Sequence, residues 1–234
     1  MSHLEIKNFS KQFDGIKAVD HVSFSFESGK ITGIIGPNGS GKSTLINLLT
    51  GVVQSDSGVM IPQYNQTTLS ITRTFQEVRI LEQMTVIDNI LIVLTKRSVW
   101  VSIFETQKEQ HFKNAKKVLE KVGLWEKRNE LAANLSYGQR KLLEIARAVA
   151  MDATVYFFDE PFAGLFPEMR KIVTSLLQEL KKKDKIIVLV EHNMELIREL
   201  SDVCLVMDSG KVLAHGSPEK VLLQTEVIET YLGK

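Results

Sequence analysis

The segment from Gly36 to Thr44 constrains this chain more than any other part of it. Its sequence GPNGSGKST fits the pattern G-x-x-x-x-G-K-[ST] and follows ITGII, an apolar run typical of a short buried strand. Lys42 to Leu49 has helical spacing, with Gly51 placed as the C-terminal cap. A glycine-rich turn between a strand and a helix points successive backbone N–H groups inward, beside the positive end of the helix dipole. This segment, the phosphate loop, therefore predicts binding of nucleotide phosphates.

Two side chains of the phosphate loop have separate predicted roles. Lys42 is expected to reach the β- and γ-phosphates of ATP, and the Ser43 hydroxyl to coordinate Mg²⁺. The alternative is a glycine-rich turn with an incidental lysine, and the full pattern in this position argues against it. Nucleotide contacts are predicted for the whole loop, which consists of Gly36, Pro37, Asn38, Gly39, Ser40, Gly41, Lys42, Ser43 and Thr44.

A second polar motif ends the apolar run VYFFDE. Its carboxylates, Asp159 and Glu160, are expected beside the phosphate loop, because ligands of parallel sheets bind at the carboxyl ends of the strands. Asp159 is the expected Mg²⁺ partner, directly or through water, and Glu160 is suited to polarising the water that attacks the γ-phosphate. A strand that simply ends in solvated acids is the alternative.

Composition excludes several classes of protein. The chain has 234 residues, 44% apolar and 24% charged, with a net charge of +1, so neither a disordered nor a fibrous protein is indicated. That balance supplies no field that would draw nucleic acid, and no nucleic-acid partner is expected. No run is apolar enough for a membrane helix or a secretory signal, so we expect a soluble, intracellular chain. Cys204, in VCLVM, is expected to be a buried core residue.

The order of patterns predicts an α/β fold. LEIKNF and VSFSF alternate like strands of an antiparallel layer, whereas VYFFDE and IIVLV are the continuous apolar runs of a buried parallel sheet, with helical patterns between and after them. Residues 85–150 have helical spacing, with a capping box at Thr85. VCLVM and KVLAH predict a hairpin, and Ser217 is expected to be the N-cap of a terminal helix that begins with proline.

These elements predict a P-loop NTPase core, a mixed and mostly parallel sheet flanked by helices, with an N-terminal antiparallel β layer and an inserted α-helical lobe. We expect one domain over residues 1–234. Its nucleotide-binding core would be 1–82 and 151–234, and its helical subdomain 83–150.

The segment LSYGQ, residues 135–139, precedes an amphipathic helix and has two compatible interpretations. Ser136 and Gln139 could form a capping box that begins the helix. The segment also resembles the signature sequence of ABC-type ATPases, which other P-loop proteins lack. That resemblance implies that Ser136, Gly138 and Gln139 bind the γ-phosphate held by an opposite subunit.

The resemblance implies roles for further residues. Gln76, in RTFQ, matches the glutamine that senses Mg²⁺ and the attacking water, and we count it with Ser43 and Asp159 as a metal-binding residue. His192, in VEHNM, matches the switch histidine that contacts the γ-phosphate; with Glu160, Gln76 and Lys42 it completes the implied catalytic set. Phe13 matches the aromatic residue on which adenine stacks, although a buried phenylalanine of an edge strand is an alternative.

Within this family, the amino-acid sequence most resembles those of the ATP-binding subunits of branched-chain amino-acid importers. The resemblance covers the whole chain, including EPFAGL and the ending VIETYLGK. It implies ATP and Mg²⁺ as cofactors, transmembrane permease subunits and a second ATPase subunit, identical or different, as partners, and a cytoplasmic location on the inner face of the membrane.

Three departures from the family pattern are visible. The stretch between Gly58 and Arg73 is short for two strands and a turn, the lobe between Lys96 and Lys108 looks trimmed, and Phe166 stands where the family has Asn or Asp. Two other functions stay open: a soluble ABC ATPase acting on DNA or ribosomes, and a regulatory subunit of low turnover, which Phe166 would suit.

Overall fold

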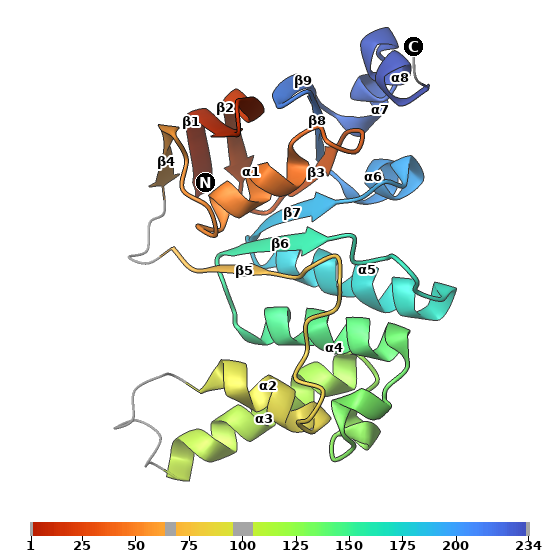
Figure 1. The fold of residues 1–234 in the computed structure, drawn as a ribbon. Helices are drawn as coiled ribbons and strands as arrows, with labels where there is room; N and C mark the ends of the chain where they lie inside the picture. The colour runs from red at the N-terminus through yellow and green to blue at the C-terminus, as the bar shows by residue number, and fades with distance from the viewer. Residues whose placement is uncertain (1, 64–68, 96–104, 233–234) are drawn as a thin grey trace. The chain divides into compact units, whose positions relative to one another are not determined.

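The computed structural model describes residues 2–63, 69–95 and 105–232. By its internal contacts the chain divides into two units (Figure 1). The first contains residues 1–73, 154–160 and 177–234, and the second contains 74–153 and 161–176. The predicted helical subdomain, 83–150, lies inside the second unit, which also contains residues 74–82, 151–153 and 161–176. The predicted domain boundaries stay a prediction.

A six-stranded sheet organises the first unit. Its order is β5-β6-β7-β3-β8-β9, in which the first five strands are parallel and β9 is antiparallel to β8. Every residue of β3, β6 and β7 is buried, as the continuous apolar runs predict for strands covered on both faces. The strands are β3 (Ile31–Ile35), β5 (Ile71–Arg73), β6 (Val155–Asp159), β7 (Ile186–Val190), β8 (Val203–Asp208) and β9 (Lys211–Gly216).

A second sheet in the first unit is the predicted antiparallel layer. It consists of β2 (Ile16–Glu27), β1 (His3–Phe13) and β4 (Ser57–Gln63), in that order. Val22 and Phe26 alternate with exposed serines along β2, which confirms the predicted inward face. Between Gly58 and Arg73 the structure gives β4 and the short β5, and residues 64–68 lie outside the described part. Residues 96–104, most of the lobe predicted to be trimmed, also lie outside it.

The core of the first unit joins the two sheets through helix α1 (Lys42–Leu49). Leu45, Ile46 and Leu49 belong to one buried cluster with β1, β2, β6, β7 and β8. The helix ends at Thr50, and Gly51 follows with φ +71°, so the predicted C-terminal glycine is confirmed. Since apolar residues of α1 pack into the core, its N-terminus, and with it the phosphate loop, is fixed on a rigid base.

The second unit is helical. Helices α2 (Val86–Leu94), α3 (Glu105–Lys121) and α4 (Tyr137–Ala150) pack against one another (Figure 1), and 3₁₀ turns at Trp125–Lys127 and Ala132–Asn134 connect α3 to α4. Thr85 caps α2 as predicted, because its side chain accepts the backbone N–H of Asp88. The Asp88 carboxylate accepts a hydrogen bond from the Thr85 hydroxyl, whereas in a capping box it would accept one from the Thr85 backbone N–H. Helix α5 (Pro167–Lys182) begins in this unit and ends in the first.

The C-terminal region contains the predicted hairpin and the predicted helix start. The hairpin of β8 and β9 is confirmed, with Ser209 and Gly210 both at positive φ, the backbone of a tight two-residue turn. The predicted helix start is confirmed, because Ser217 immediately precedes the four-residue helix α7 (Pro218–Val221), which begins with proline; a separate α8 (Thr225–Leu232) follows. Ser217 takes the N-cap position without a side-chain hydrogen bond. Cys204 is buried, as expected, and burial raises the pKa of its thiol to about 12.

Helix α6 (Met194–Leu200) completes the first unit. Asn193 caps it by accepting the backbone N–H groups of Glu195 and Leu196. Gly33 of β3 leaves room for this helix, since a Cβ there would lie 2.8 Å from the Ile197 Cδ1 atom. Among the described residues, no helix combines the length and apolar character needed to cross a membrane.

Candidate nucleotide-binding site

The backbone of the phosphate loop can be built only with glycine at two positions. Gly36 and Gly41 have φ of +152° and +100°. A Cβ on Gly36 would lie 2.2 Å from the Met207 carbonyl oxygen, and one on Gly41 would lie 2.2 Å from that of Ala18. Close contact with β2 and β8 therefore dictates the glycines, and the loop backbone is held against both strands.

We expect Gly41→Ala to destabilise the chain by about 1–3 kcal/mol, because the loop or β2 must shift to admit the methyl group. Urea denaturation without nucleotide measures the effect. Gly39→Ala is the matched control, since Gly39 also has positive φ but nothing lies within 4 Å of its Cβ position. A loss of stability no larger at Gly41 than at Gly39 would show that the contact with Ala18 is unimportant.

Lys42 is buried and folds back over the loop. Its Nζ atom donates to the carbonyl oxygens of Gly36 at 2.7 Å and Pro37 at 2.9 Å. Burial lowers the pKa of this lysine, while Glu160 and Asp159 act in the opposite direction. The structure therefore brings Lys42 and both predicted carboxylates into one electrostatic environment in the first unit.

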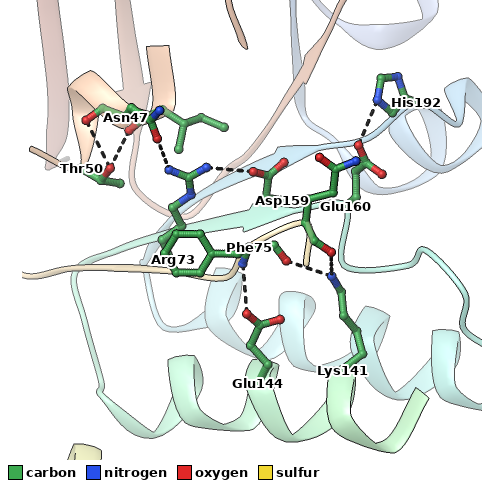
Figure 2. A network of polar contacts seen from close by, with 11 residues as sticks. Asn47, Thr50, Arg73, Phe75, Lys141, Glu144, Asp159, Glu160 and His192 are labelled. Atoms are coloured by element: carbon green, nitrogen blue, oxygen red, sulfur yellow. Dashed lines mark hydrogen bonds and ion pairs between the residues drawn. The ribbon is translucent and has the colours of Figure 1, made fainter. Parts of the chain in front are cut away.

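Glu160 lies directly after β6 in a strained backbone conformation. Its φ is +48°, the left-handed region that costs a non-glycine residue about 1–3 kcal/mol. Two contacts hold it there: its N–H donates to the Val190 oxygen at 2.9 Å, and its Oε1 atom lies 3.0 Å from the Nε2 atom of His192 (Figure 2). The strained backbone therefore holds the Glu160 carboxylate beside His192, directly after the carboxyl end of β6.

Phe13, the last residue of β1, is 45% exposed. The alternative of a buried phenylalanine of an edge strand is therefore wrong. The Lys11 Nζ atom lies 5.5 Å from the centre of its ring, a cation–π contact that leaves an aromatic surface in solvent. Adenine stacking on Phe13 stays a prediction.

In the second unit, Ser136 begins α4 with a complete capping box. Its hydroxyl accepts the Gln139 N–H at 3.3 Å, and the Gln139 side chain accepts the Ser136 N–H at 3.1 Å. The capping interpretation is thus confirmed. Gly138 lies against α5, where a Cβ would approach the Met169 sulfur to 2.7 Å. The phosphate-binding role of this segment stays a prediction.

Gln76 lies in a segment whose backbone is bound by charged side chains of α4 (Figure 2). The Lys141 Nζ atom donates to the carbonyl oxygens of Phe75 at 3.0 Å and Gln76 at 3.1 Å. The Glu144 Oε1 atom accepts the N–H groups of Phe75 and Arg79, both at 3.2 Å. Lys141 and Glu144 are both buried. Within the second unit, therefore, the segment containing Gln76 is attached to the helix that Ser136 caps.

The predicted site residues thus form two groups. The first unit holds the phosphate loop, Asp159, Glu160 and His192, and the second holds Gln76 and the Ser136 segment. A family model described as ABC transporter matches residues 19–163, more than half of the 234 residues. The chain belongs to the ABC transporter family.

Two curated relatives extend the match over the whole length of this ABC cassette. The probable branched-chain amino acid transport ATP-binding protein LivG of Archaeoglobus fulgidus is 36% identical, covering 100% of this chain and 96% of the relative. The high-affinity branched-chain amino acid transport ATP-binding protein LivG of Salmonella typhimurium is 34% identical, covering 99% and 98%. The predicted resemblance is confirmed.

Solved structures confirm the predicted fold. A crystal structure of the ADP conformation of an ATP-binding cassette of an ABC transporter has a TM-score of 0.82 and 35% identity, covering 100% of both chains. A nucleotide-free cassette has a TM-score of 0.84 and 34% identity with the same coverage. This ABC cassette is accordingly a nucleotide-binding ATPase domain.

The donor atoms of the first unit suit Mg²⁺. Ser43 offers a hydroxyl in the first turn of α1, and Asp159 a carboxylate at the end of β6. Mg²⁺ binds oxygen ligands and, in nucleotide sites, uses few protein ligands together with phosphate oxygens and water. Ser43 and Asp159 would hold the ion in this ABC cassette.

Glu144 gives this cassette a testable pH dependence. Burial raises the pKa of its carboxyl, while Lys141, two backbone N–H groups and Arg147 oppose the rise, and among the described residues its Oε2 atom has no hydrogen-bond partner. The folded chain therefore keeps this proton to higher pH than the unfolded chain, so the contribution of Glu144 to stability declines as pH rises past the ordinary carboxyl pKa.

Glu144→Gln removes this titration and keeps a carbonyl oxygen for the two N–H donors. The free energy of unfolding of this variant, relative to the parent, should therefore increase between about pH 4 and about pH 7. Urea denaturation across that range measures the difference, with the exposed Glu199→Gln as control. A difference that does not change with pH would contradict the assignment.

Sequence reasoning missed the roles of Lys141, Glu144 and Arg73. The only local signal in α4 is a pair of charges three residues apart, which is equally common on an exposed helix face. For Arg73 the only signal is a charge at the end of a short, partly buried strand.

Proposed function

We propose that this ABC cassette binds and hydrolyses ATP with Mg²⁺ and thereby energises a membrane transporter that imports amino acids. The observation that carries the proposal is the convergence, in the first unit, of the phosphate loop, Lys42, Asp159 and Glu160, with His192 bonded to Glu160. The names of the full-length relatives support amino-acid transport as the process.

Each proposed role follows from a side chain's position. Lys42, already aimed at the loop carbonyls, would turn to the β- and γ-phosphates, which are stronger acceptors for an ammonium group. Glu160 would orient and polarise the attacking water, with His192 holding the carboxylate and contacting the γ-phosphate. Mg²⁺, when bound, supplies charge neutralisation at the phosphates. Phe13 would stack on adenine.

The second unit supports a role for a partner chain. We infer that Ser136, Gly138 and Gln139 close over ATP bound by another ATPase subunit, because a capped helix start offers N–H groups and a positive dipole end to an anion. Gln76 lies in a segment bonded to the same helix. It would contact Mg²⁺ and the attacking water, and its movement would be transmitted to transmembrane permease subunits. The cassette would then sit on the cytoplasmic face of the membrane through those subunits.

Phe166 is the feature that favours the second candidate function, a regulatory subunit of low turnover. It is 72% exposed, directly before α5, where the family pattern has Asn or Asp. A polar residue there could hydrogen-bond across an interface, and phenylalanine cannot. The residues proposed for hydrolysis, Lys42, Asp159, Glu160 and His192, are all present. Phenylalanine at position 166 would therefore alter communication between the two nucleotide sites and not the chemical step itself.

Two measurements on the tagged chain test the proposed function. Mg²⁺-dependent phosphate release by the purified chain separates an active subunit from a regulatory one, because substantial turnover excludes the latter. Proteins that co-purify from detergent-solubilised membranes test the transporter. Multispanning membrane proteins are expected; recovery of ribosomes or DNA, with no membrane protein, would favour the soluble ABC ATPase instead.

A further inference from the structure

Arg73, the last residue of β5, forms a buried link between two other elements of the first unit (Figure 2). One guanidinium nitrogen, Nη1, donates to the Oδ1 atom of Asn47 in α1, and the other, Nη2, donates to the Oδ2 atom of Asp159 at the end of β6, at 2.9 Å. The side chains of Arg73 and Asp159 are only 11% and 10% exposed. The ion pair is therefore little screened by solvent and restricts both side chains.

The link reaches the helix face that carries Ser43. Asn47 follows Ser43 by four residues in α1, so the two side chains lie one above the other on the same face of the helix. Arg73 thus connects the turn next to Ser43 with Asp159. These two residues supply the oxygen donors that suit Mg²⁺, from elements that the sequence places far apart.

Two physical effects of Arg73 on a cation at this site oppose each other. Hydrogen bonds to a metal ligand orient it, and loss of such a partner typically weakens metal binding about 10- to 100-fold. A guanidinium beside Asp159 also repels a cation, so its removal could strengthen metal binding. The substitution Arg73→Lys separates orientation from repulsion. Lysine keeps the positive charge, but its ammonium group lacks the planar fork with which arginine binds Asn47 and Asp159 at the same time.

We propose that Arg73 is a positioning residue that fixes Asp159 relative to Ser43 and so sets the Mg²⁺ affinity of the nucleotide site. This inference rests on the proposed function and deepens it. Since Asn47 supplies the other end of the link, it shares the role, with a smaller effect because Arg73 keeps its bond to Asp159 when Asn47 is shortened.

The test is a Mg²⁺ titration of the full chain at a fixed concentration of a fluorescent ATP analogue. It compares the parent with Arg73→Lys, Arg73→Gln, Asn47→Ala and the double variant of Arg73→Lys and Asn47→Ala. Arg73→Lys should raise the half-saturating Mg²⁺ concentration about 10-fold or more, and Asn47→Ala should raise it less. The double variant should match Arg73→Lys, because both changes break one link. The exposed Arg198→Lys is the control.

Two further readouts separate positioning from stability and from nucleotide affinity. Binding of the analogue in EDTA should stay within about twofold of the parent, because the phosphate loop is unchanged. Thermal melting without nucleotide shows whether a variant is folded at the assay temperature. An unchanged Mg²⁺ midpoint with a lowered melting temperature would mean that the link is structural only.

The remaining outcomes are also decisive. A lowered Mg²⁺ midpoint in Arg73→Gln, which removes the charge, would show that repulsion by the guanidinium outweighs positioning, and would overturn the proposal. If the parent binds the analogue with no dependence on Mg²⁺, the proposed function itself fails. If the parent shows that dependence and the variants match it, only the role of Arg73 fails.

Discussion

Glu160→Gln is expected to bind Mg-ATP about as tightly as the parent and to hydrolyse it about 10²- to 10⁴-fold more slowly, the usual contribution of a positioned general base. Glutamine has the same shape and can still bond to the Nε2 atom of His192, 3.0 Å from the present carboxylate oxygen. It cannot accept a proton from water. Binding should therefore survive while the chemical step is lost.

Phosphate release and nucleotide binding, measured on the same preparation, test this prediction. Because hydrolysis would no longer separate two ATP-bound subunits, the variant should also form an ATP-dependent dimer on size-exclusion chromatography. Glu199→Gln, an exposed change on α6, is the matched control and should behave as the parent does. Normal turnover in Glu160→Gln would remove Glu160 from the role assigned to it.

Lys42→Ala is expected to weaken ATP binding about 10- to 100-fold, since hydrogen bonds to charged groups contribute about 1.5–3 kcal/mol. The folded chain should be little affected. The buried ammonium loses solvation, which is why its pKa is lowered, and removing it relieves that cost along with the bonds to Gly36 and Pro37.

Equilibrium binding of ATP with and without Mg²⁺ measures the effect of Lys42→Ala. Lys30→Ala is a suitable control, because Lys30 lies in the same unit and forms only a half-exposed ion pair with Glu27. Equal affinity of Lys42→Ala and the parent for Mg-ATP would contradict the assignment of the phosphate loop.

Local patterns sufficed to predict the first unit's framework and one of the two site groups. The glycines at 36 and 41 belong to a motif of fixed spacing, Asp159 ends a continuous apolar run, and Ser136 caps its helix through Gln139, so local spacing identifies them. The contacts that require the two glycines come from Met207 and Ala18, which spacing does not reveal. The family resemblance added Gln76 and His192, whose types carry no local signal. Phe13 needed the structure, because exposure depends on how β1 is covered.

What the sequence could not predict depends on contacts between distant segments. Arg73 bonds to residues 26 and 86 positions away, and no periodicity relates them. Lys141 and Glu144 looked like charges of an exposed helix face, yet both are buried on the backbone of residues 75–79. The separation of α7 and α8 was not predicted, because residues 222–224 are Leu-Leu-Gln, which all favour helix, and packing overrides such weak preferences.

ATP-driven uptake by reconstituted vesicles determines whether ATP hydrolysis by this chain energises import. The vesicles would contain the membrane proteins that co-purify with this chain, together with either the parent or Glu160→Gln, and leucine, isoleucine and valine would be assayed as first substrates. Uptake is expected on addition of Mg-ATP to the side that carries the parent chain, and none is expected with Glu160→Gln. Equal uptake with both chains would contradict this expectation, because transport would then not depend on hydrolysis by this subunit.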